Sequence, residues 1–300
     1  MQDNLTYSLC DPQNKKQRIW ELDFIRGFLI FLMLIDHFVF AMYDIVPSFF
    51  SSFAIEKTWL NYVIKFGDYY WNANWRIVIR QISLFGFFTV CGVCTHFSKS
   101  NFKRGCQLLF LGLFISIFSI ILSNESLYGF LKSFNLGTFF VVYSLFTCYG
   151  ICLLMYELFK FIYFLFFKNE YYFSFVCLFF SMLIIFLCVY FKIDFYDTNL
   201  VYYEYVSFFD GFFMLKVPSS QMDYFPIIPY IIYVFLGAFI GGALYKDQKS
   251  LIIKKDNYFS KKFSKPILFI GHYSIFFYLF QQVPFIIFWY LVYYFTLKGI

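Results

Sequence analysis

The stretch from Arg18 to His37, RIWELDFIRGFLIFLMLIDH, constrains the fold most, because charged residues flank a strongly apolar run. It starts with acidic and basic residues and ends in Asp36 and His37. On one helix, Asp23 and His37 lie roughly 20 Å apart, at 1.5 Å per residue. Charged groups in lipid are costly and usually face a bundle interior or a watery cavity. The stretch therefore predicts a membrane-embedded helix with polar groups near both ends.

Composition supports a membrane protein. Of the 300 residues, 61% are hydrophobic and only 14% are charged, and the mean hydropathy is +0.67. Soluble domains are about half apolar and roughly one quarter charged. We expect an all-α, polytopic integral membrane protein, with about seven transmembrane helices in one bundle. No internal repeat or second domain is visible, so residues 1–300 are expected to form one transmembrane domain behind a polar tail, 1–17.

The apolar runs define the expected spans. Residues 47–75 are expected to form a loop that lies partly at the membrane interface, and 157–167 to lie along it. The last span is expected to tilt or break at Pro284. The seven predicted spans are 23–44, 76–97, 105–123, one that starts near Leu136, 171–191, 225–245 and one from Pro266 to about Phe295.

The distribution of Lys and Arg predicts the topology. The tail and the connections 98–104, 160–170 and 246–265 are basic, whereas 47–75, 124–135 and 192–224 are balanced or acidic. These two kinds of connection alternate along the chain. Because cytoplasmic loops carry the excess of Lys and Arg, the N-terminus is expected in the cytoplasm and the C-terminus outside.

Two small patterns call for structural explanations. Cys91, Cys94 and His96 form C-x-x-C-x-H, but the pattern differs from the C-x-x-C-H of haem attachment and has no second ligand pair nearby. We expect packing cysteines, with no metal site and no disulfide. Gly237 and Gly241 are four residues apart, a spacing typical of close helix packing in membranes.

The predicted topology sorts the remaining polar residues by depth. Asp23, Arg26, His96 and His272 fall near the inner face, and Asp36, His37, Arg76, Arg80 and Asp223 near the outer face. His96 and His272 are expected at the interface, and Arg76 is expected to anchor there by snorkelling. Arg80 lies one turn deeper. Asp23 and Arg26 either anchor the helix start as a pair or serve a site.

His37 is the candidate general base among these groups. It follows a long apolar run and is the histidine expected near the outer face, and imidazole titrates near neutral pH. The adjacent Asp36 points about 100° away on a helix, so the two side chains need not interact.

Four segments, in order, carry a resemblance to a known family. The chain resembles the heparan-α-glucosaminide N-acetyltransferase catalytic family, formerly a domain of unknown function in bacteria, within the wider group of transmembrane acyltransferases. The departures are Gln281, where the family has a histidine before Gln-Pro, and His272, which is displaced by one place. The segments are 18–37, GVCTHFSKSNFKRG at 92–105, DYFPIIPYIIYVFLGAFIG at 223–241 and GHYSIFFYLFQQVP at 271–284.

The resemblance implies an acyltransferase that takes an acyl group, expected to be acetyl, from cytoplasmic acetyl-CoA or another acyl-CoA. The acceptor would be a hydroxyl or amine of a sugar or other cell-surface glycan at the outer face. His37 matches the family histidine of the first span. The sites implied are His37 and Asp36 for catalysis, Arg80, Asp223 and Tyr224 for the acceptor, and Asp23 and Arg26 for the donor.

The remaining expectations concern the location of the protein, its partners and two alternative functions. The protein is expected in a bacterial plasma membrane, in contact with the lipid bilayer and with no nucleic-acid partner; a homodimer is left open. Two other functions also require or tolerate charges in the membrane. One is a transporter or flippase for a polar or lipid-linked glycan. The other is a non-catalytic membrane protein whose charges are anchors.

Overall fold

The computed structural model describes residues 19–122, 144–191, 202–203, 217–218, 224–246, 248–252 and 258–299. The predicted polar tail, the 124–135 loop, the start of the fourth span near Leu136 and Asp223 lie outside these residues. In the described part, one pair of two-residue strands accompanies the helices: β1 (Tyr202–Tyr203) pairs in parallel with β2 (Val217–Pro218).

The predicted all-α membrane fold is confirmed. Six helical segments are long and apolar enough to cross a membrane, or up to seven when a bent pair near the C-terminus counts as one span. Side chains cap the N-termini of two of these segments. Ser144 accepts a hydrogen bond from the Thr147 N–H at 3.2 Å, and Asn169 accepts one from the Tyr171 N–H at 2.9 Å. The segments are α1 (Trp20–Phe40) with its extension to Phe49, α4 (Asn74–Val93), α5 (Asn101–Leu122), α7 (Leu145–Phe166), α8 (Glu170–Tyr190) and α10 (Ile227–Leu244).

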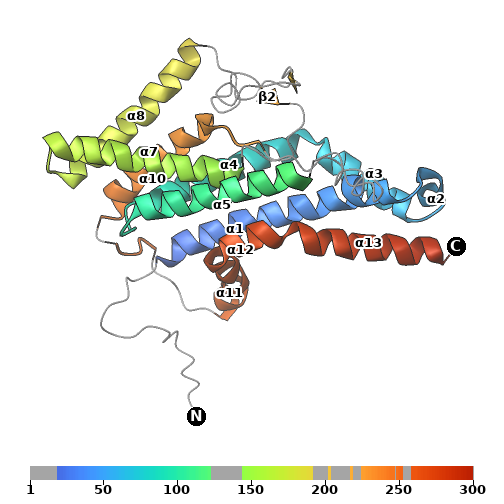
Figure 1. The fold of residues 1–300 in the computed structure, drawn as a ribbon. Coiled ribbons are helices and arrows are strands. Elements are labelled where there is room, and N and C mark those ends of the chain that lie inside the picture. The colour runs from blue at the N-terminus through green and yellow to red at the C-terminus, as the bar shows by residue number, and fades with distance from the viewer. Residues whose placement is uncertain are drawn as a thin grey trace.

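Helix α1 lies at the centre of the molecule and packs on α4 and on α11 (Tyr258–His272) (Figure 1). The contact with α11 is made at glycine: a Cβ at Gly27 would overlap the Ile267 carbonyl oxygen and lie 2.8 Å from the Gly271 nitrogen. Beyond its α-helical part, α1 continues through a π-helical turn (Ala41–Ile45) and a 3-10 turn (Val46–Phe49).

Helix α13 (Gln282–Lys298) runs beside the second half of α1 (Figure 1). The indole N–H of Trp289 donates to the Phe38 carbonyl at 3.2 Å, and the Tyr293 hydroxyl donates to the Met42 carbonyl at 2.7 Å. These donors bind backbone carbonyls around the point where α1 changes from an α-helix to a π-helix. Residues 251 positions apart in the sequence therefore stabilise the far end of α1.

Glycine also determines how α10 meets α4. A Cβ at Gly237 would lie 2.9 Å from the Gly92 Cα, and one at Gly241 would lie 2.8 Å from the Val93 carbonyl oxygen. The spacing of Gly237 and Gly241 in the sequence thus corresponds to an observed close helix contact. On the other side of α10 lies α8, and α5 packs along α7.

The 47–75 segment differs from its prediction, because it forms two helices instead of a loop: α2 (Ser52–Glu56) and α3 (Leu60–Trp71). Leu60 and Gly67 on α3 are buried, whereas Tyr62, Phe66 and Tyr69 are exposed. One face of α3 therefore packs on the bundle while aromatic side chains cover the other, as expected of a helix at a membrane interface.

One further segment differs from its prediction, whereas the last span breaks close to Pro284, as expected. Residues 157–166 continue α7 without a break, where we expected a segment along the interface. The last span is divided into α11, α12 (Ser274–Phe280) and α13, with a bend of 42° between α12 and α13. The bend comes before Pro284, which lies in the first turn of α13. Its missing N–H there removes the bond that would continue the helix from Phe280.

The connections sort to opposite ends of the bundle. The start of α1, the α4–α5 turn, the α7–α8 turn and the end of α10 lie at one end, and α3 and the C-terminus at the other (Figure 1). The basic connections in the described part of the chain thus share one end, and we call it the basic end. The end with α3 is called the α3 end.

The basic end should face the cytoplasm, because Lys and Arg accumulate in cytoplasmic loops. In a variant in which the exposed Cys106 is replaced by Ser, an impermeant thiol reagent should not label Lys249→Cys in intact cells. It should label Tyr62→Cys, on the exposed face of α3. Both positions should react after the membrane is opened. Labelling of Lys249→Cys but not Tyr62→Cys in intact cells would contradict this orientation.

Candidate functional site

A two-pronged ion pair joins the end of α1 to the start of α4. Arg76 donates from Nε to one Asp36 carboxylate oxygen at 2.6 Å and from Nη2 to the other at 2.8 Å. The side chains are 8% and 18% exposed, respectively. The prediction that Arg76 snorkels as an interfacial anchor is therefore wrong: a carboxylate at the same depth draws the guanidinium into the protein.

Two aromatic residues from the end of α3 complete this pair. The Arg76 guanidinium carbon lies 3.3 Å from the centre of the Trp71 ring, and Nη1 donates to the Trp71 carbonyl at 3.3 Å. The Tyr70 hydroxyl donates to Asp36 at 3.2 Å. Burial, and then the nearby Asp36 charge, raise the pKa of Tyr70 to about 12, so this hydroxyl keeps its proton as a donor. Stacking and hydrogen bonding use the planar shape of arginine, which lysine lacks.

His37 is half-buried beside this pair in sequence but has a different partner. Its Nδ1 lies 2.8 Å from the Met33 carbonyl oxygen, one turn earlier on α1. Because a carbonyl only accepts, Nδ1 carries the hydrogen, and the neutral ring then has its lone pair on Nε2. The carboxylate of Asp36 is bound by Arg76 and Tyr70 instead. The structure therefore assigns separate environments to the two predicted catalytic residues.

Asp23 and Arg26 form the second ion pair of α1, at the basic end. Arg26 Nη2 lies 2.6 Å from an Asp23 oxygen, with side-chain exposures of 24% and 17%. The Nε of Arg26 is buried without a hydrogen-bond partner among the described residues. The Arg26 side chain lies near Cys91 on α4 and Cys94, the residue that follows α4. The pair is thus part of the contact between α1 and α4.

Arg26 and His37 lie on the same face of α1. They are separated by 11 positions, which amounts to about 20° of rotation and about 16 Å along the axis. Ile30, between them on this face, is 2% exposed. The face therefore points into the bundle, with a cation at one end and an imidazole at the other.

Two of the residues predicted for the acceptor, Arg80 and Tyr224, lie on or next to helices other than α1. Arg80 is exposed and has no ion pair or hydrogen bond to another described residue. Tyr224 is half-buried just before α10, and Asp223 is outside the described residues. Of the two arginines one turn apart on α4, the structure pairs Arg76 with α1. The sequence places Asp36 near the same outer end but does not show which of the two arginines faces it.

Sequence reasoning missed Glu21, which is 3% exposed at the start of α1. Its carboxylate accepts from the Ser250 hydroxyl at 2.6 Å and from the Leu251 N–H at 2.8 Å. Beside it, the Trp20 indole N–H donates to the Ile252 carbonyl at 3.2 Å. These bonds fasten the connection after α10 to the first turn of α1. The sequence feature that could have indicated a role for Glu21 is its position, as a carboxylate in the first turn of an apolar helix.

Gln281, the position at which the resemblance leads us to expect a histidine, lies at the bend between α12 and α13. It is 8% exposed, and its side-chain oxygen has no partner in the described part of the chain. Phe285, one turn later, lies 5.4 Å from the Phe38 ring, and Gly271 lies against Gly27. These contacts place Gln281 beside the stretch of α1 between its two polar ends.

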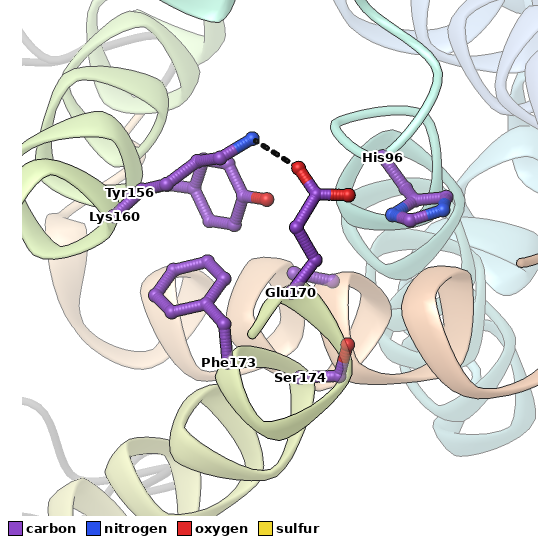
Figure 2. Close-up of a pocket in the computed structure, with 7 residues that line it drawn as sticks. His96, Tyr156, Lys160, Glu170, Phe173 and Ser174 are labelled. Carbon is purple, nitrogen blue, oxygen red and sulfur yellow. Dashed lines mark ion pairs between the residues drawn. The ribbon is translucent and has the colours of Figure 1, made fainter. Parts of the chain in front are cut away.

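The cysteine motif has a packing environment. Cys91 is buried and Cys94 half-buried, and both are free thiols. The Tyr149 hydroxyl donates to the Cys91 carbonyl at 3.2 Å. Across the described ranges, no group of three or more His, Cys, Asp or Glu side chains could hold a metal ion. His96 lines a small polar cavity of about 40 Å³ between α7, α8 and α10 (Figure 2).

Removal of Arg76 should destabilise the protein strongly, because Asp36 would remain buried without its counter-charge. We expect Arg76→Ala to cost about 3 kcal/mol, as for other broken buried pairs. Arg80→Ala, one turn away and exposed, should change stability by less than about 0.5 kcal/mol. Asp36→Asn combined with Arg76→Gln should recover part of the loss. Thermal unfolding in detergent provides the measurement, and equal losses for Arg76→Ala and Arg80→Ala would refute the role of the pair.

The sequence was compared with protein families, with curated proteins and with solved structures. The sequence model described as heparan-alpha-glucosaminide N-acetyltransferase, catalytic, matches residues 18–283. No curated protein and no solved structure matches the chain. The matched range includes both ion pairs of α1, His37 and the bend at Gln281, and it covers far more than half of the sequence. The chain therefore belongs to the heparan-α-glucosaminide N-acetyltransferase catalytic family.

Proposed function

We propose that this protein is a transmembrane acyltransferase that moves an acetyl group from acetyl-CoA to a hydroxyl or amine of a glycan across the membrane. The observation that carries the proposal is the inward face of α1, with Arg26 at the basic end and His37 about 16 Å further along. Family membership supports acetyl transfer. A donor on one side and an acceptor on the other require polar groups at both depths.

The donor end of the proposed site is formed by Asp23 and Arg26. Arginine has five N–H donors, and the described contacts of Arg26 use Nη2 for Asp23 while Nε has no partner. The carboxylate fixes the direction of the guanidinium. Arg26 is thus oriented by Asp23, and its remaining N–H groups can bind carbonyl or phosphate oxygens of acyl-CoA.

His37 acts as the general base in this proposal. Its Nε2 accepts the proton of the acceptor hydroxyl or amine while the acceptor oxygen or nitrogen bonds to the thioester carbonyl carbon. The carbon–sulfur bond then breaks, and the leaving sulfur of CoA takes the proton from the imidazolium. The bond from Nδ1 to Met33 holds the ring in the tautomer that this step needs.

Asp36 and Arg76 act as positioning residues rather than as proton carriers. Their ion pair holds the start of α4 and the end of α3 against α1, next to His37 in the sequence. Arg80, exposed and without a described partner, remains the proposed contact for an acceptor group, with Tyr224 before α10.

Transfer of radiolabel from acetyl-CoA to glycan by the purified protein in membranes tests the proposal. We expect His37→Ala and His37→Gln to lower turnover by about two to four orders of magnitude, because neither side chain can accept the proton. His272→Gln, at the end of α11, should behave like wild type, and CoA binding should survive all three changes.

Turnover of His37→Ala within about threefold of wild type would refute the general-base assignment, given the usual size of that effect. Movement of glycan across the membrane without transfer of label would favour a transporter instead.

A further inference from the structure

A second polar site lies at the basic end, apart from the Asp23–Arg26 pair. It is the cavity of about 40 Å³ lined by His96 after α4, by Tyr156 and Lys160 of α7, by Glu170, Phe173 and Ser174 of α8, and by Ala238 of α10. The proposed reaction does not use these polar side chains, although Tyr156 and Ser174 are also buried in the packed bundle. A volume of this size holds a few water molecules or one small oxyanion, not a sugar or a nucleoside.

The two opposite charges that line the cavity, Lys160 and Glu170, form a loose and exposed ion pair. Figure 2 shows the Glu170 carboxylate between the Lys160 ammonium and the His96 ring, with the Tyr156 and Ser174 hydroxyls on the sides of the cavity. Lys160 Nζ lies 3.9 Å from the nearest Glu170 oxygen, and the Glu170 side chain is 70% exposed. Such exposed, loose pairs contribute little to stability. Glu170 can therefore leave the cavity at small cost.

The groups that stay behind when Glu170 leaves are mostly hydrogen-bond donors. Lys160 is a cation, and the His96 ring and the Ser174 hydroxyl contain groups that can donate a hydrogen bond, whereas the Tyr156 hydroxyl bonds to the Thr95 side chain. A second cation at this end of the bundle, Lys246, does not line the cavity and lies 5.5 Å from the centre of the Tyr171 ring. An oxyanion in the place of the carboxylate would meet these donors from α7, α8 and the α4–α5 turn.

We propose that this cavity binds a phosphate group, and that Glu170 occupies the phosphate position until the ligand displaces it. Phosphate presents several acceptor oxygens and a charge that the Lys160 ammonium matches. Two sources fit a site at this end of the bundle. One is a phosphate of acyl-CoA, which depends on the proposed function, and the other is the headgroup of an anionic phospholipid, which does not.

Opposite effects of two substitutions test the site. Lys160→Gln should weaken phosphate binding about tenfold, the usual size for loss of one charged hydrogen bond. Glu170→Gln should strengthen it several-fold, because the competing charge is removed. Lys168→Gln provides the matched control, since Lys168 is an exposed lysine in the α7–α8 turn that does not line the cavity.

Two probes separate the sources. CoA is titrated into the purified protein, and retention of phosphatidylglycerol relative to phosphatidylcholine is measured by native mass spectrometry from mixed nanodiscs. The probe that responds to Lys160→Gln and Glu170→Gln in opposite directions identifies the source. A response of phosphatidylglycerol alone, in a protein that transfers no acetyl group, would support this site while the proposed function fails.

The proposal is overturned if Glu170→Gln binds both probes no better than wild type, because the carboxylate would then not compete for the site. It is also overturned if Lys168→Gln weakens binding as much as Lys160→Gln, or if neither probe binds. Binding is measured without turnover, so loss of activity through His37 does not affect the result.

Discussion

The ion pair between Asp36 and Arg76 determines how the first two spans meet. A bare carboxylate or guanidinium at this depth would be expensive, and the two-pronged geometry compensates both charges at once. Further along the same interface, Gly86 receives the Leu29 side chain and Arg26 faces Cys94. Residues nearer the start of α1 thus contact residues nearer the end of α4. The ion pair therefore sets an antiparallel register that the apolar contacts then follow.

Aromatic side chains keep water away from this interaction. Trp71 lies between the Arg76 guanidinium on one side and Phe40 and Tyr43 of α1, with ring centres at 4.6 and 5.5 Å. A dry environment strengthens the attraction between charges. It also gives the short helix α3 a function in the fold, because α3 supplies both Trp71 and Tyr70. The interfacial helix and the two spans are in this way parts of one polar assembly.

The fold class and most of the spans could be predicted because apolar runs and basic connections carry that information directly. The partner of Asp36 could not, because Arg76 and Arg80 are one turn apart and depth alone does not show which of them faces α1. The helices α2 and α3 were missed because mixed charges and aromatics hide an amphipathic pattern. Glu21 was missed because its partners, a hydroxyl and a backbone N–H, leave no mark in the sequence. Family motifs located His37, but its tautomer depends on a backbone carbonyl that only the structure shows.

The bonds of α1 to distant residues have a consequence for biosynthesis. Glu21 obtains its partners from residues 229 and 230 positions later, and the carbonyls of Phe38 and Met42 obtain theirs 251 positions later. Proteins generally fold from the N-terminus while synthesis continues. Here α1 carries a carboxylate and carbonyls whose donors are translated more than 200 residues later. Until α13 enters the membrane, the Phe38 and Met42 carbonyls lack the donors from Trp289 and Tyr293. A chain that stops after α10 would therefore leave these carbonyls exposed to the quality-control machinery of the cell.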